Sequence, residues 1–354
     1  MSDLSPTSIL QNVGLPNTLS LPVRARKVLL AESVSVLQQG LGAAGGEPVF
    51  VLGGGSNVVL PSFVNRLTVW VKLKGIWRQT SEGNTGVFDV AAGESWQGFV
   101  KFCIGQGLGG GIENLSLIPG TVGGAPIQNI GAYGVEVAQF IRAVQVLDMQ
   151  SPGSAPIILS KEECNFGYRD SLFKQQPGRW LVLQVRFAVP HAEHARRYLD
   201  YAGIAEALER SGCRRVVPAT IAEAVAKLRR AKLPDPRRQP NAGSFFKNPV
   251  LSAAQLAQLR QTLPADAAGE LAQIPSWPHA QGRKLAAAAL IERTGFKRRP
   301  AETVGVWYRQ PLVLLNLGGA TTTTVMAYAD EIRQKVEARF GVRLEQEPVQ
   351  VQAD

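Results

Sequence analysis

The sequence predicts an α+β protein with more than one domain. Three observations support this: the length of 354 residues, a first part made of short strands separated by glycines, and helical patterns from about residue 221. A chain of this length exceeds what one hydrophobic core usually serves, so two or three domains are expected. The proline-rich segment 232–243, KLPDPRRQPNAG, lies where the pattern changes and marks a hinge or a domain boundary.

The strand-rich part begins with PVFVLGGGSNVVL at 48–60, in which two apolar strands flank a glycine loop. Alternation at 66–77 predicts a further strand, and 87–107 predicts a strand followed by a helix. One face of that helix carries three residues at helical spacing: Trp96, Val100 and Cys103.

The segment 107–134 is rich in glycine and lacks periodicity. We therefore expect it to wrap around another group, and this contact to give it a fixed structure. Strands are expected again at 141–149 and 179–190. The later helical patterns cover 221–231, 252–262, 284–294 and 321–339, with strands at 311–316 and after Gly341.

Composition excludes some classes of protein. Hydrophobic residues make up 45% of the chain and charged residues 19%, which is enough to fill cores. No apolar stretch of about 18 residues is present, and the N-terminus lacks the basic start and apolar run of a signal peptide. The cysteines are odd in number, far apart and without metal-type spacing, so a cytoplasmic protein without a metal site is expected.

The formal net charge of +10 suggests an anionic partner, and nucleic acid is the first candidate. The basic residues are dispersed, however, and no nucleic-acid motif accompanies them. A basic solvated surface explains most of them. A pocket for a phosphorylated small molecule would need only a few, and Arg229 and Lys232 lie on the segment that enters the last domain.

The loop GGGSN at 53–57 has the composition of an anion site. Its glycines allow close backbone approach and can turn N–H groups toward a pyrophosphate, while Ser56 and Asn57 add donors. A plain hairpin turn is the alternative. GQGLGG at 105–110 matches the dinucleotide pattern GxGxxG only formally, because it follows a helix instead of a strand, and a helix stop is favoured.

In NAGSFFKNP, residues 241–249, Ser244 precedes Lys247 by three positions, the spacing of one class of serine acyl-enzymes. Those enzymes also need Lys-Thr-Gly on a facing strand, which Arg293-Thr294-Gly295 resembles only superficially. In FGYRDSLFK (166–174), a salt-bridged surface turn is the plain interpretation. Glu345 and Glu347 would share one face of a strand.

Together these stretches resemble the UDP-N-acetylenolpyruvoylglucosamine reductase (UDP-N-acetylmuramate dehydrogenase) family, in its longer class with an extra tyrosine-bearing segment. The motifs follow the family's order along nearly the whole chain: Asn17-Thr18, GGGSN, AGESW, ENLSLIPGTVGGAPIQNIGAYG, FGYRDSLFK, KLPDP, NAGSFFKNP and the final Glu. The resemblance implies three domains. Residues 1–75, joined by a C-terminal strand at about 342–354, and residues 76–231 would form a vanillyl-alcohol-oxidase-like FAD-binding fold, and 232–341 would bind substrate.

The resemblance implies NADPH-dependent, FAD-mediated reduction of UDP-N-acetylglucosamine enolpyruvate to UDP-N-acetylmuramate in peptidoglycan synthesis. FAD would be bound without a covalent link, because the glycine loops hold no histidine or cysteine. Neither nucleic acid nor membrane insertion is expected; the acyl-enzyme and the nucleic-acid binder are the alternatives. The cofactor contacts would come from Gly53, Gly54, Gly55, Ser56, Asn57, Pro119, Gly120, Thr121, Gly123, Ile127 and Gly131.

By the same resemblance, Ser244 matches the family's proton donor, and Arg169 and Glu347 match its carboxylate-activating pair. The chemistry develops negative charge on an enolate, which the fork of Arg169 can stabilise. Glu347 is expected to be protonated or bridged through another group, since an ionised carboxylate would repel this anion. The substrate contacts would be Tyr168, Tyr201, Lys232, Asn248 and Gln310.

Overall fold

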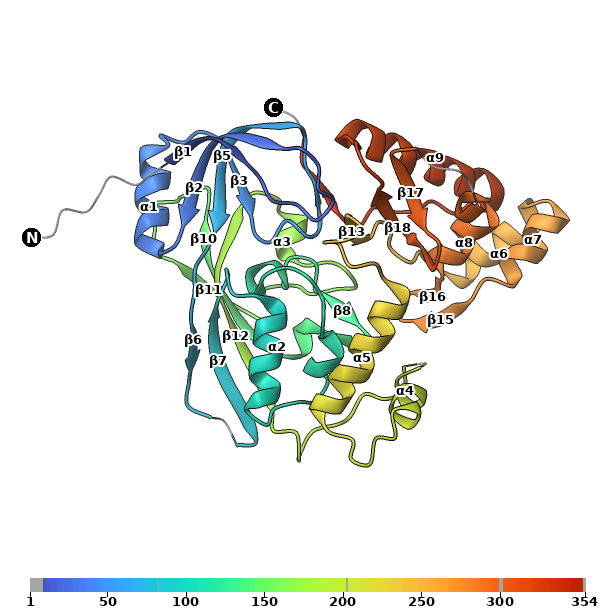
Figure 1. Ribbon diagram of the computed structural model, residues 1–354, viewed down its shortest axis with the longest axis horizontal. Coiled ribbons are helices and arrows are strands. Elements are labelled where there is room, and N and C mark those ends of the chain that lie inside the picture. Colours follow the sequence, from blue (N-terminus) through green and yellow to red (C-terminus); the bar gives the residue numbers. More distant parts are fainter. Residues whose placement is uncertain (1–8, 82, 202, 299–301, 353–354) are drawn as a thin grey trace, which may run out of the picture.

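The computed structural model describes residues 9–352, apart from 82, 202 and 299–301. The predicted N-terminal subdomain and its C-terminal strand extend into residues 1–8 and 353–354, which lie outside the described residues. Figure 1 shows a strand-rich body that carries the N-terminus and a lobe of helices and short strands beside it.

The first sheet has the strand order β1-β2-β5-β3. β1 is antiparallel to β2, whereas β2 and β3 run parallel to β5. Along β2, the side chains of Val28 and Leu29 enter two different hydrophobic cores, so both faces of the sheet are covered. The elements are β1 (Ile9–Gly14), β2 (Arg24–Ala31), α1 (Val34–Ala43), β3 (Val49–Leu52) and β5 (Phe63–Val71).

The second sheet is antiparallel and has the order β11-β10-β12-β7-β6. Its strands are β6 (Ile76–Arg78), β7 (Thr85–Ala91), β10 (Ile141–Asp148), β11 (Ile157–Ser160) and β12 (Trp180–Pro190). Helix α2 (Trp96–Gly105) begins at the cap Ser95, whose hydroxyl accepts the N–H of Gly98. The predicted buried face of α2 is confirmed, because Trp96, Val100 and Cys103 are all inaccessible to solvent.

The segment 107–134 is mostly irregular, as predicted, and contains only short turns and one short strand: η1 (Ile112–Leu115), η2 (Val122–Gly124) and β8 (Gly131–Ala132), which pairs with β9 (Val135–Glu136). The buried indole of Trp96 donates to the carbonyl of Leu115 at 2.9 Å and fastens this segment to α2. The elements that follow are η3 (Val137–Gln139), α3 (Leu172–Gln175), α4 (Ile204–Arg210) and α5 (Pro218–Lys232).

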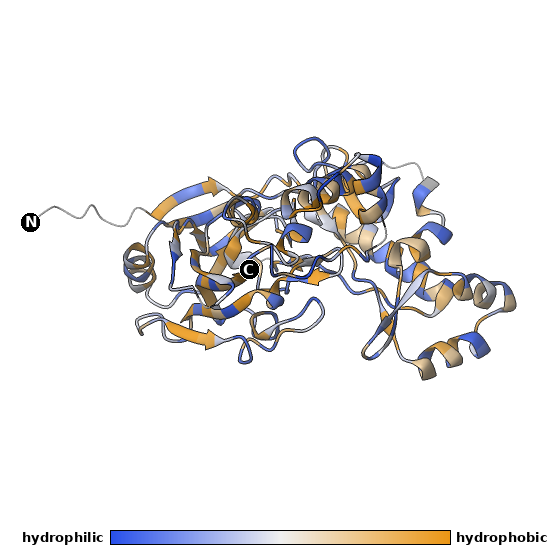
Figure 2. Ribbon diagram, turned by 90° about the horizontal axis from the view of Figure 1, so that it is seen from below, coloured by the Kyte–Doolittle hydropathy of each residue, from blue (hydrophilic) through white to orange (hydrophobic). Residues whose placement is uncertain are grey.

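The C-terminal lobe combines two small sheets, of orders β13-β18-β17 and β14-β16-β15, with four helices among the described residues. The sheet strands are β13 (Asn241–Ser244), β14 (Val250–Leu251), β15 (Ser276–His279), β16 (Gly282–Leu285), β17 (Val304–Trp307) and β18 (Gln310–Asn316). The helices are α6 (Ala253–Thr262), α7 (Ala265–Ala272), α8 (Ala287–Arg293) and α9 (Thr322–Phe340), with the turn η4 (Phe296–Arg298). Many of the lobe's hydrophobic residues belong to one buried core, and Figure 2 shows hydrophobic and hydrophilic positions mixed along its helices.

Two sequence predictions need correction. The helix expected at 284–294 begins only at Ala287, because Gly282–Leu285 forms β16 and pairs with both β14 and β15. The strand expected at 66–77 is interrupted, since β5 ends at Val71 and β6 begins at Ile76 after Gly75, which has φ +133°. Helices α1, α3, α4 and α7 were not predicted.

The chain returns to its beginning near the C-terminus. β19 (Val349–Gln350) pairs in parallel with β4 (Val58–Val59), directly after the GGGSN loop. The C-terminal segment therefore lies against the first glycine loop, although about 290 residues separate them. In the part of the chain that the structure describes, no helix is both long and apolar enough to cross a membrane.

Candidate active site

A cavity of about 810 Å³ lies where these segments meet. Its volume is within the range of about 300–1,000 Å³ that is usual for ligand pockets. Its lining residues come from distant parts of the sequence, and include every predicted cofactor residue: Gly53, Gly54, Gly55, Ser56, Asn57, Pro119, Gly120, Thr121, Gly123, Ile127 and Gly131. The structure brings both glycine loops to one cavity, and the same cavity is lined by Arg169, Ser244 and Glu347.

The loop Gly53–Asn57 presents backbone donors to this cavity. Within the described residues, the N–H groups of Gly54, Gly55 and Ser56 have no hydrogen-bond partner. Thr18 fastens the loop, donating its N–H to the Gly55 carbonyl at 3.0 Å and its hydroxyl to the Ser56 carbonyl at 3.4 Å. The hairpin alternative is wrong, because β4 pairs with β19 and β3 pairs with β5. Free N–H groups in such a turn suit an anion.

Two glycines of these loops leave no room for a side chain. Gly55 has φ +65°, and a Cβ there would overlap the carbonyl oxygen of Pro16. Gly120 has φ +116°, and a Cβ there would lie 2.8 Å from Ser56 Oγ. Ser56 itself joins the loops by donating its hydroxyl to the Pro119 carbonyl at 3.2 Å. Glycine is therefore required at both positions by conformation and by space.

Arg169 and Glu347 form a partly buried ion pair across the cavity. Arg169 Nε donates to Glu347 Oε1 at 3.0 Å, and its Nη2 donates to the Gly131 carbonyl at 2.7 Å. The Glu347 backbone is held on both sides, by its N–H on the Phe245 carbonyl at 2.9 Å and by Asn57 Nδ2 on its own carbonyl at 3.4 Å. The pair thus connects the glycine loops to the C-terminal segment.

Arg169 occupies a strained position in a tight turn. Gly167 and Asp170 exchange backbone hydrogen bonds at 3.0 and 3.2 Å, and Arg169, between them, has φ +55°. Glycine or asparagine usually fills this position, and strained residues cluster at functional sites. The plain interpretation of a surface salt bridge is wrong, because Asp170 is bonded by Gln175 and Arg169 turns to Glu347.

Ser244 lies at the end of β13, after Gly243 with φ +73°. Its hydroxyl has no hydrogen-bond partner among the described residues and the residue lines the cavity. Lys247 points elsewhere: its Nζ donates to Glu345 Oε2 at 2.8 Å. No bond links this lysine to Ser244 in the described structure, so the arrangement does not support an acyl-enzyme nucleophile.

The two C-terminal glutamates have different surroundings. Residues 345–347 run beside 245–247 through an isolated bridge between Phe246 and Gln346, outside any regular strand. The side chain of Glu345 is 73% exposed and pairs with Lys247, whereas that of Glu347 is 13% exposed and pairs with Arg169. The expectation that both project alike therefore fails.

The five predicted substrate contacts are not among the residues that line the cavity: Tyr168, Tyr201, Lys232, Asn248 and Gln310. Tyr168 lies beside it, with its ring 5.5 Å from the guanidinium of Arg169 and 5.7 Å from the ring of His279. Burial raises the pKa of Tyr168. Asn248 Oδ1 accepts the N–H of Ala287 at 3.0 Å, at the start of α8.

The other three lie in two groups. The ring of Tyr201, which is 44% exposed, lies 5.0 Å from that of Tyr133. Trp307 connects the remaining two, because its Nε1 donates to the Lys232 carbonyl at 3.0 Å and it pairs with Gln310 in the β17–β18 hairpin. Their contact with substrate stays a prediction.

Three cations that line the cavity were absent from the predicted site: Arg66, Lys174 and Arg229. Burial lowers the pKa of Arg229, and the charge of Arg169 lowers it further. The structure gives the Arg229 side chain no hydrogen bond or ion pair within the described residues. The signal for it in the sequence is its position three residues before Lys232, on one face of α5.

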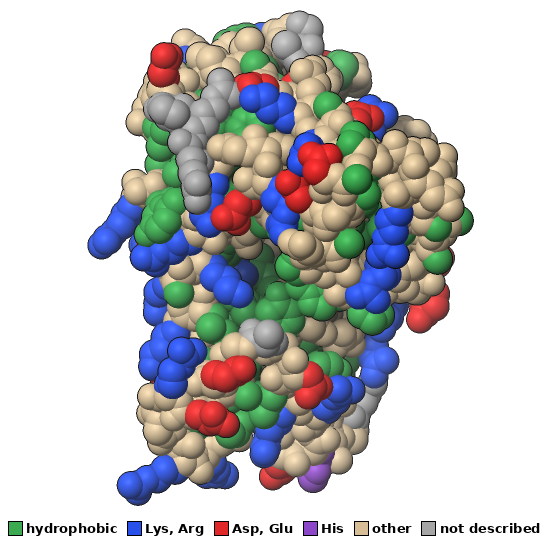
Figure 3. Space-filling model, turned by 90° about the vertical axis from the view of Figure 1, so that its right-hand side faces the viewer, with side chains coloured by type: hydrophobic (Ala, Val, Ile, Leu, Met, Phe, Trp, Pro, Cys, Tyr) green, Lys and Arg blue, Asp and Glu red, His purple; other side chains and the backbone are tan. Residues whose placement is uncertain are grey.

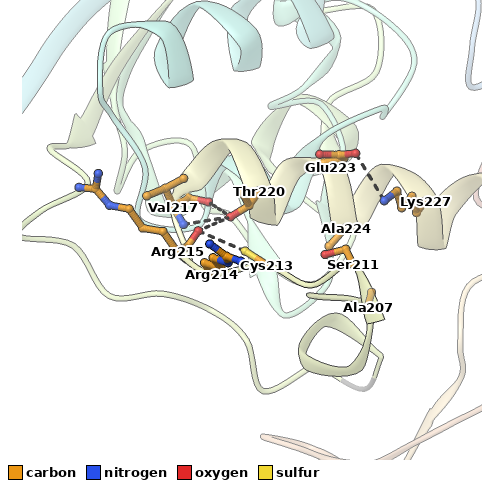
Figure 4. Close-up of a pocket in the computed structure, with 10 residues that line it drawn as sticks. All are labelled: Ala207, Ser211, Cys213, Arg214, Arg215, Val217, Thr220, Glu223, Ala224 and Lys227. Atoms are coloured by element: carbon orange, nitrogen blue, oxygen red, sulfur yellow. Dashed lines mark hydrogen bonds and ion pairs between the residues drawn. The ribbon is translucent and has the colours of Figure 1, made fainter. Parts of the chain in front are cut away.

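A second cavity, of about 380 Å³, lies between α4 and α5 (Figure 4). None of the predicted site residues lines it. Its polar groups largely bond one another, since Lys227 pairs with Glu223 at 3.4 Å and Thr220 Oγ1 donates to the Val217 carbonyl at 2.9 Å. This cavity is separate from the site described above.

Comparison with known families and proteins agrees with this geometry. Residues 25–151 match an FAD binding domain, and residues 235–351 match the C-terminal domain of UDP-N-acetylenolpyruvoylglucosamine reductase. The protein of that name from Azoarcus sp. (strain BH72) is 44% identical over 96% of this chain and 96% of its own. The one from Pseudomonas aeruginosa is 42% identical over 94% of this chain and 95% of its own.

Among solved structures, the UDP-N-acetylenolpyruvylglucosamine reductase from Thermus caldophilus superimposes with a TM-score of 0.62. The alignment covers 98% of this chain and 100% of that one, at 23% identity. At this identity the likeness supports the fold alone.

Proposed function

The chain belongs to the UDP-N-acetylenolpyruvoylglucosamine reductase family, and we infer that it reduces UDP-N-acetylglucosamine enolpyruvate to UDP-N-acetylmuramate with NADPH and FAD. The observation that carries this inference is the single cavity that joins two glycine loops to Arg169, Ser244 and Glu347. A plain nucleotide site would need the loops only, and an acyl-enzyme would need a base beside Ser244.

The residues present fit FAD. The loop Gly53–Asn57 offers unpaired N–H groups. Gly120 can lie close to this loop because neither Gly120 nor Gly54 has a side chain. Such a donor-lined turn suits the pyrophosphate of a dinucleotide. When bound, FAD would supply the flavin that takes up hydride from NADPH and passes it to the substrate.

Arg169 would bind the carboxylate of the enolpyruvyl group and stabilise the negative charge that develops on it. Its guanidinium is fixed by Gly131 and Glu347 before substrate arrives, and preorganised donors stabilise developing charge most effectively. Because Arg169 already pairs with Glu347, the glutamate does not face the incoming anion as an uncompensated charge. Of the two sequence expectations for Glu347, protonation or a bridge through another group, this contact supports the bridge.

Ser244 would deliver the proton that completes the reduction at the α-carbon. Its hydroxyl is free of protein partners within the described structure and lies in the same cavity as Arg169. The engagement of Lys247 with Glu345 supports an acid rather than a nucleophile.

The net charge of +10 is consistent with anionic small-molecule substrates. Figure 3 shows Lys and Arg distributed over one face with Asp and Glu between them. We propose that Tyr168, Tyr201, Lys232, Asn248 and Gln310 contact the UDP-sugar. We also propose the domain limits given above, a cytoplasmic location and a role in peptidoglycan synthesis, without nucleic acid or membrane insertion.

The test follows the flavin absorbance of the purified protein without oxygen. NADPH should bleach it, and the enolpyruvyl sugar should then restore it with formation of UDP-N-acetylmuramate. A protein that binds no FAD, or whose reduced flavin ignores the sugar, would contradict the proposal.

A further inference from the structure

Lys174, at the cavity, bonds to the backbone of an active-site residue. Its Nζ donates to the carbonyl oxygen of Arg169 at 3.1 Å. Within the described residues Lys174 forms no ion pair, so this carbonyl is the sole hydrogen-bond partner of its ammonium. The lysine comes from α3, whose cap Ser171 is itself tied to the Ile127 carbonyl at 2.6 Å.

Packing alone does not explain a lysine here. Burial lowers the pKa of Lys174, and the nearby charge of Lys247 lowers it further, against the opposing effect of Glu347 and other carboxylates. Lysines usually extend their ammonium groups into water. A methionine would fill the same space without the cost of desolvating a charge. The reason for a lysine at this position is therefore the hydrogen bond from its ammonium to the carbonyl of Arg169.

The bonded carbonyl belongs to the strained residue of the turn. Arg169 has φ +55°, a conformation that persists only where the surroundings enforce it. Its side chain is held by Gly131 and Glu347, and its backbone carbonyl is held by Lys174. Without the third contact, the turn can relax toward an ordinary conformation and carry the guanidinium away from the cavity.

We propose that Lys174 is a positioning residue that holds the strained turn of Arg169, and thereby aims its guanidinium at the substrate carboxylate. This inference rests on the proposed function for its catalytic consequence. The proposed role of Lys174 is limited to the position of Arg169, and no effect on the glycine loops is expected.

The test compares Lys174→Met with Gln175→Met in the FAD-loaded protein. Gln175 is a matched control, because it lies on the same helix and bonds the same turn at Asp170, but does not line the cavity. Lys174→Met should keep or raise the melting temperature and be reduced by NADPH normally, yet be reoxidised by the enolpyruvyl sugar about 10–100-fold more slowly, the scale of a misplaced group. Lys174→Arg should recover part of the rate, and Gln175→Met should stay near wild type.

Hydrogen exchange of the peptide 166–172 gives a readout independent of the reaction. It should exchange faster in Lys174→Met than in Gln175→Met, because the turn is released. Equal exchange in the two variants, or equal slowing of both half-reactions in Lys174→Met, would overturn the proposal. If wild type binds FAD but is not reoxidised by the sugar, the proposed function fails, and the exchange comparison alone decides the role of Lys174.

Discussion

The two ends of the cavity are built in different ways. At the glycine end, the loops 53–57 and 119–124 act through backbone donors and through the absence of side chains. At the charged end, Arg169, Ser244 and Glu347 contribute side chains from three distant segments to the lining. Changes at the glycine end should therefore affect cofactor binding, and changes at the charged end should affect the reaction of bound cofactor with the sugar.

The largest effect is expected at Ser244, the proposed proton donor. Ser244→Ala should bind FAD and be reduced by NADPH at a near-normal rate, because the hydroxyl bonds none of the described residues and so supports no part of their fold. Reoxidation by the enolpyruvyl sugar should slow by about 10²–10⁴-fold, the scale of a positioned acid. Stopped-flow flavin absorbance separates the two steps, and Ser244→Cys should regain part of the loss. Equal slowing of both steps, or a covalent adduct on Ser244, would reject the assignment.

A smaller effect is expected from the ion pair. Glu347→Gln should keep FAD and lose sugar reduction by about 10²-fold, because Arg169 loses its charged anchor and shifts. Glu345→Gln is the control, because Glu345 is exposed, pairs with Lys247 and lies two residues away. It should reduce the rate of sugar reduction only mildly. Steady-state rates with sugar decide between them, and the reverse ranking would reassign the site to Glu345.

The smallest effect is expected at Lys247. Its pair with the exposed Glu345 is of the kind that contributes about 0–1 kcal/mol, so Lys247→Ala should slow the enzyme less than about fivefold. Turnover measured beside Ser244→Ala checks this. A loss as large as that of Ser244→Ala would restore the serine–lysine hypothesis.

Local sequence predicted the parts of the fold that local physics determines. Helix α6 was predicted at 252–262 and forms at Ala253–Thr262, because Ser252 and Gln255 complete a capping box. The loop at 53–57 was also recognised as a possible anion site, with a hairpin turn as the alternative, whereas the cofactor role of the second glycine loop came only from the family resemblance. The hairpin β15–β16 was missed because its strands have only four residues each, and the end of β16 was assigned to the alanine-rich helix that follows it.

The charged end could be predicted only through the family resemblance. Nothing local indicates that Glu347, 178 residues from Arg169, pairs with it, or that Glu345 turns to Lys247 instead. Long-range register sets both contacts. Lys174 was missed because an isolated basic residue usually lies on a solvated surface. Arg229 was named as a basic residue on the segment that enters the last domain but was not placed in the site, and only the cavity distinguishes both from other basic residues.

The central claim is that the glycine end binds FAD through its backbone, and a titration of FAD into Gly55→Ala and Gly45→Ala apoproteins tests it most directly. Both glycines are left-handed, at φ +65° and +62°, so both variants carry similar strain, but a Cβ at Gly45 meets nothing within 4 Å. Gly55→Ala should weaken FAD binding by at least about tenfold, because a Cβ there overlaps the carbonyl oxygen of Pro16 and displaces the loop, so that an N–H group no longer reaches the charged pyrophosphate. Gly45→Ala should bind FAD as wild type does. Equal affinities in the two variants would contradict the account.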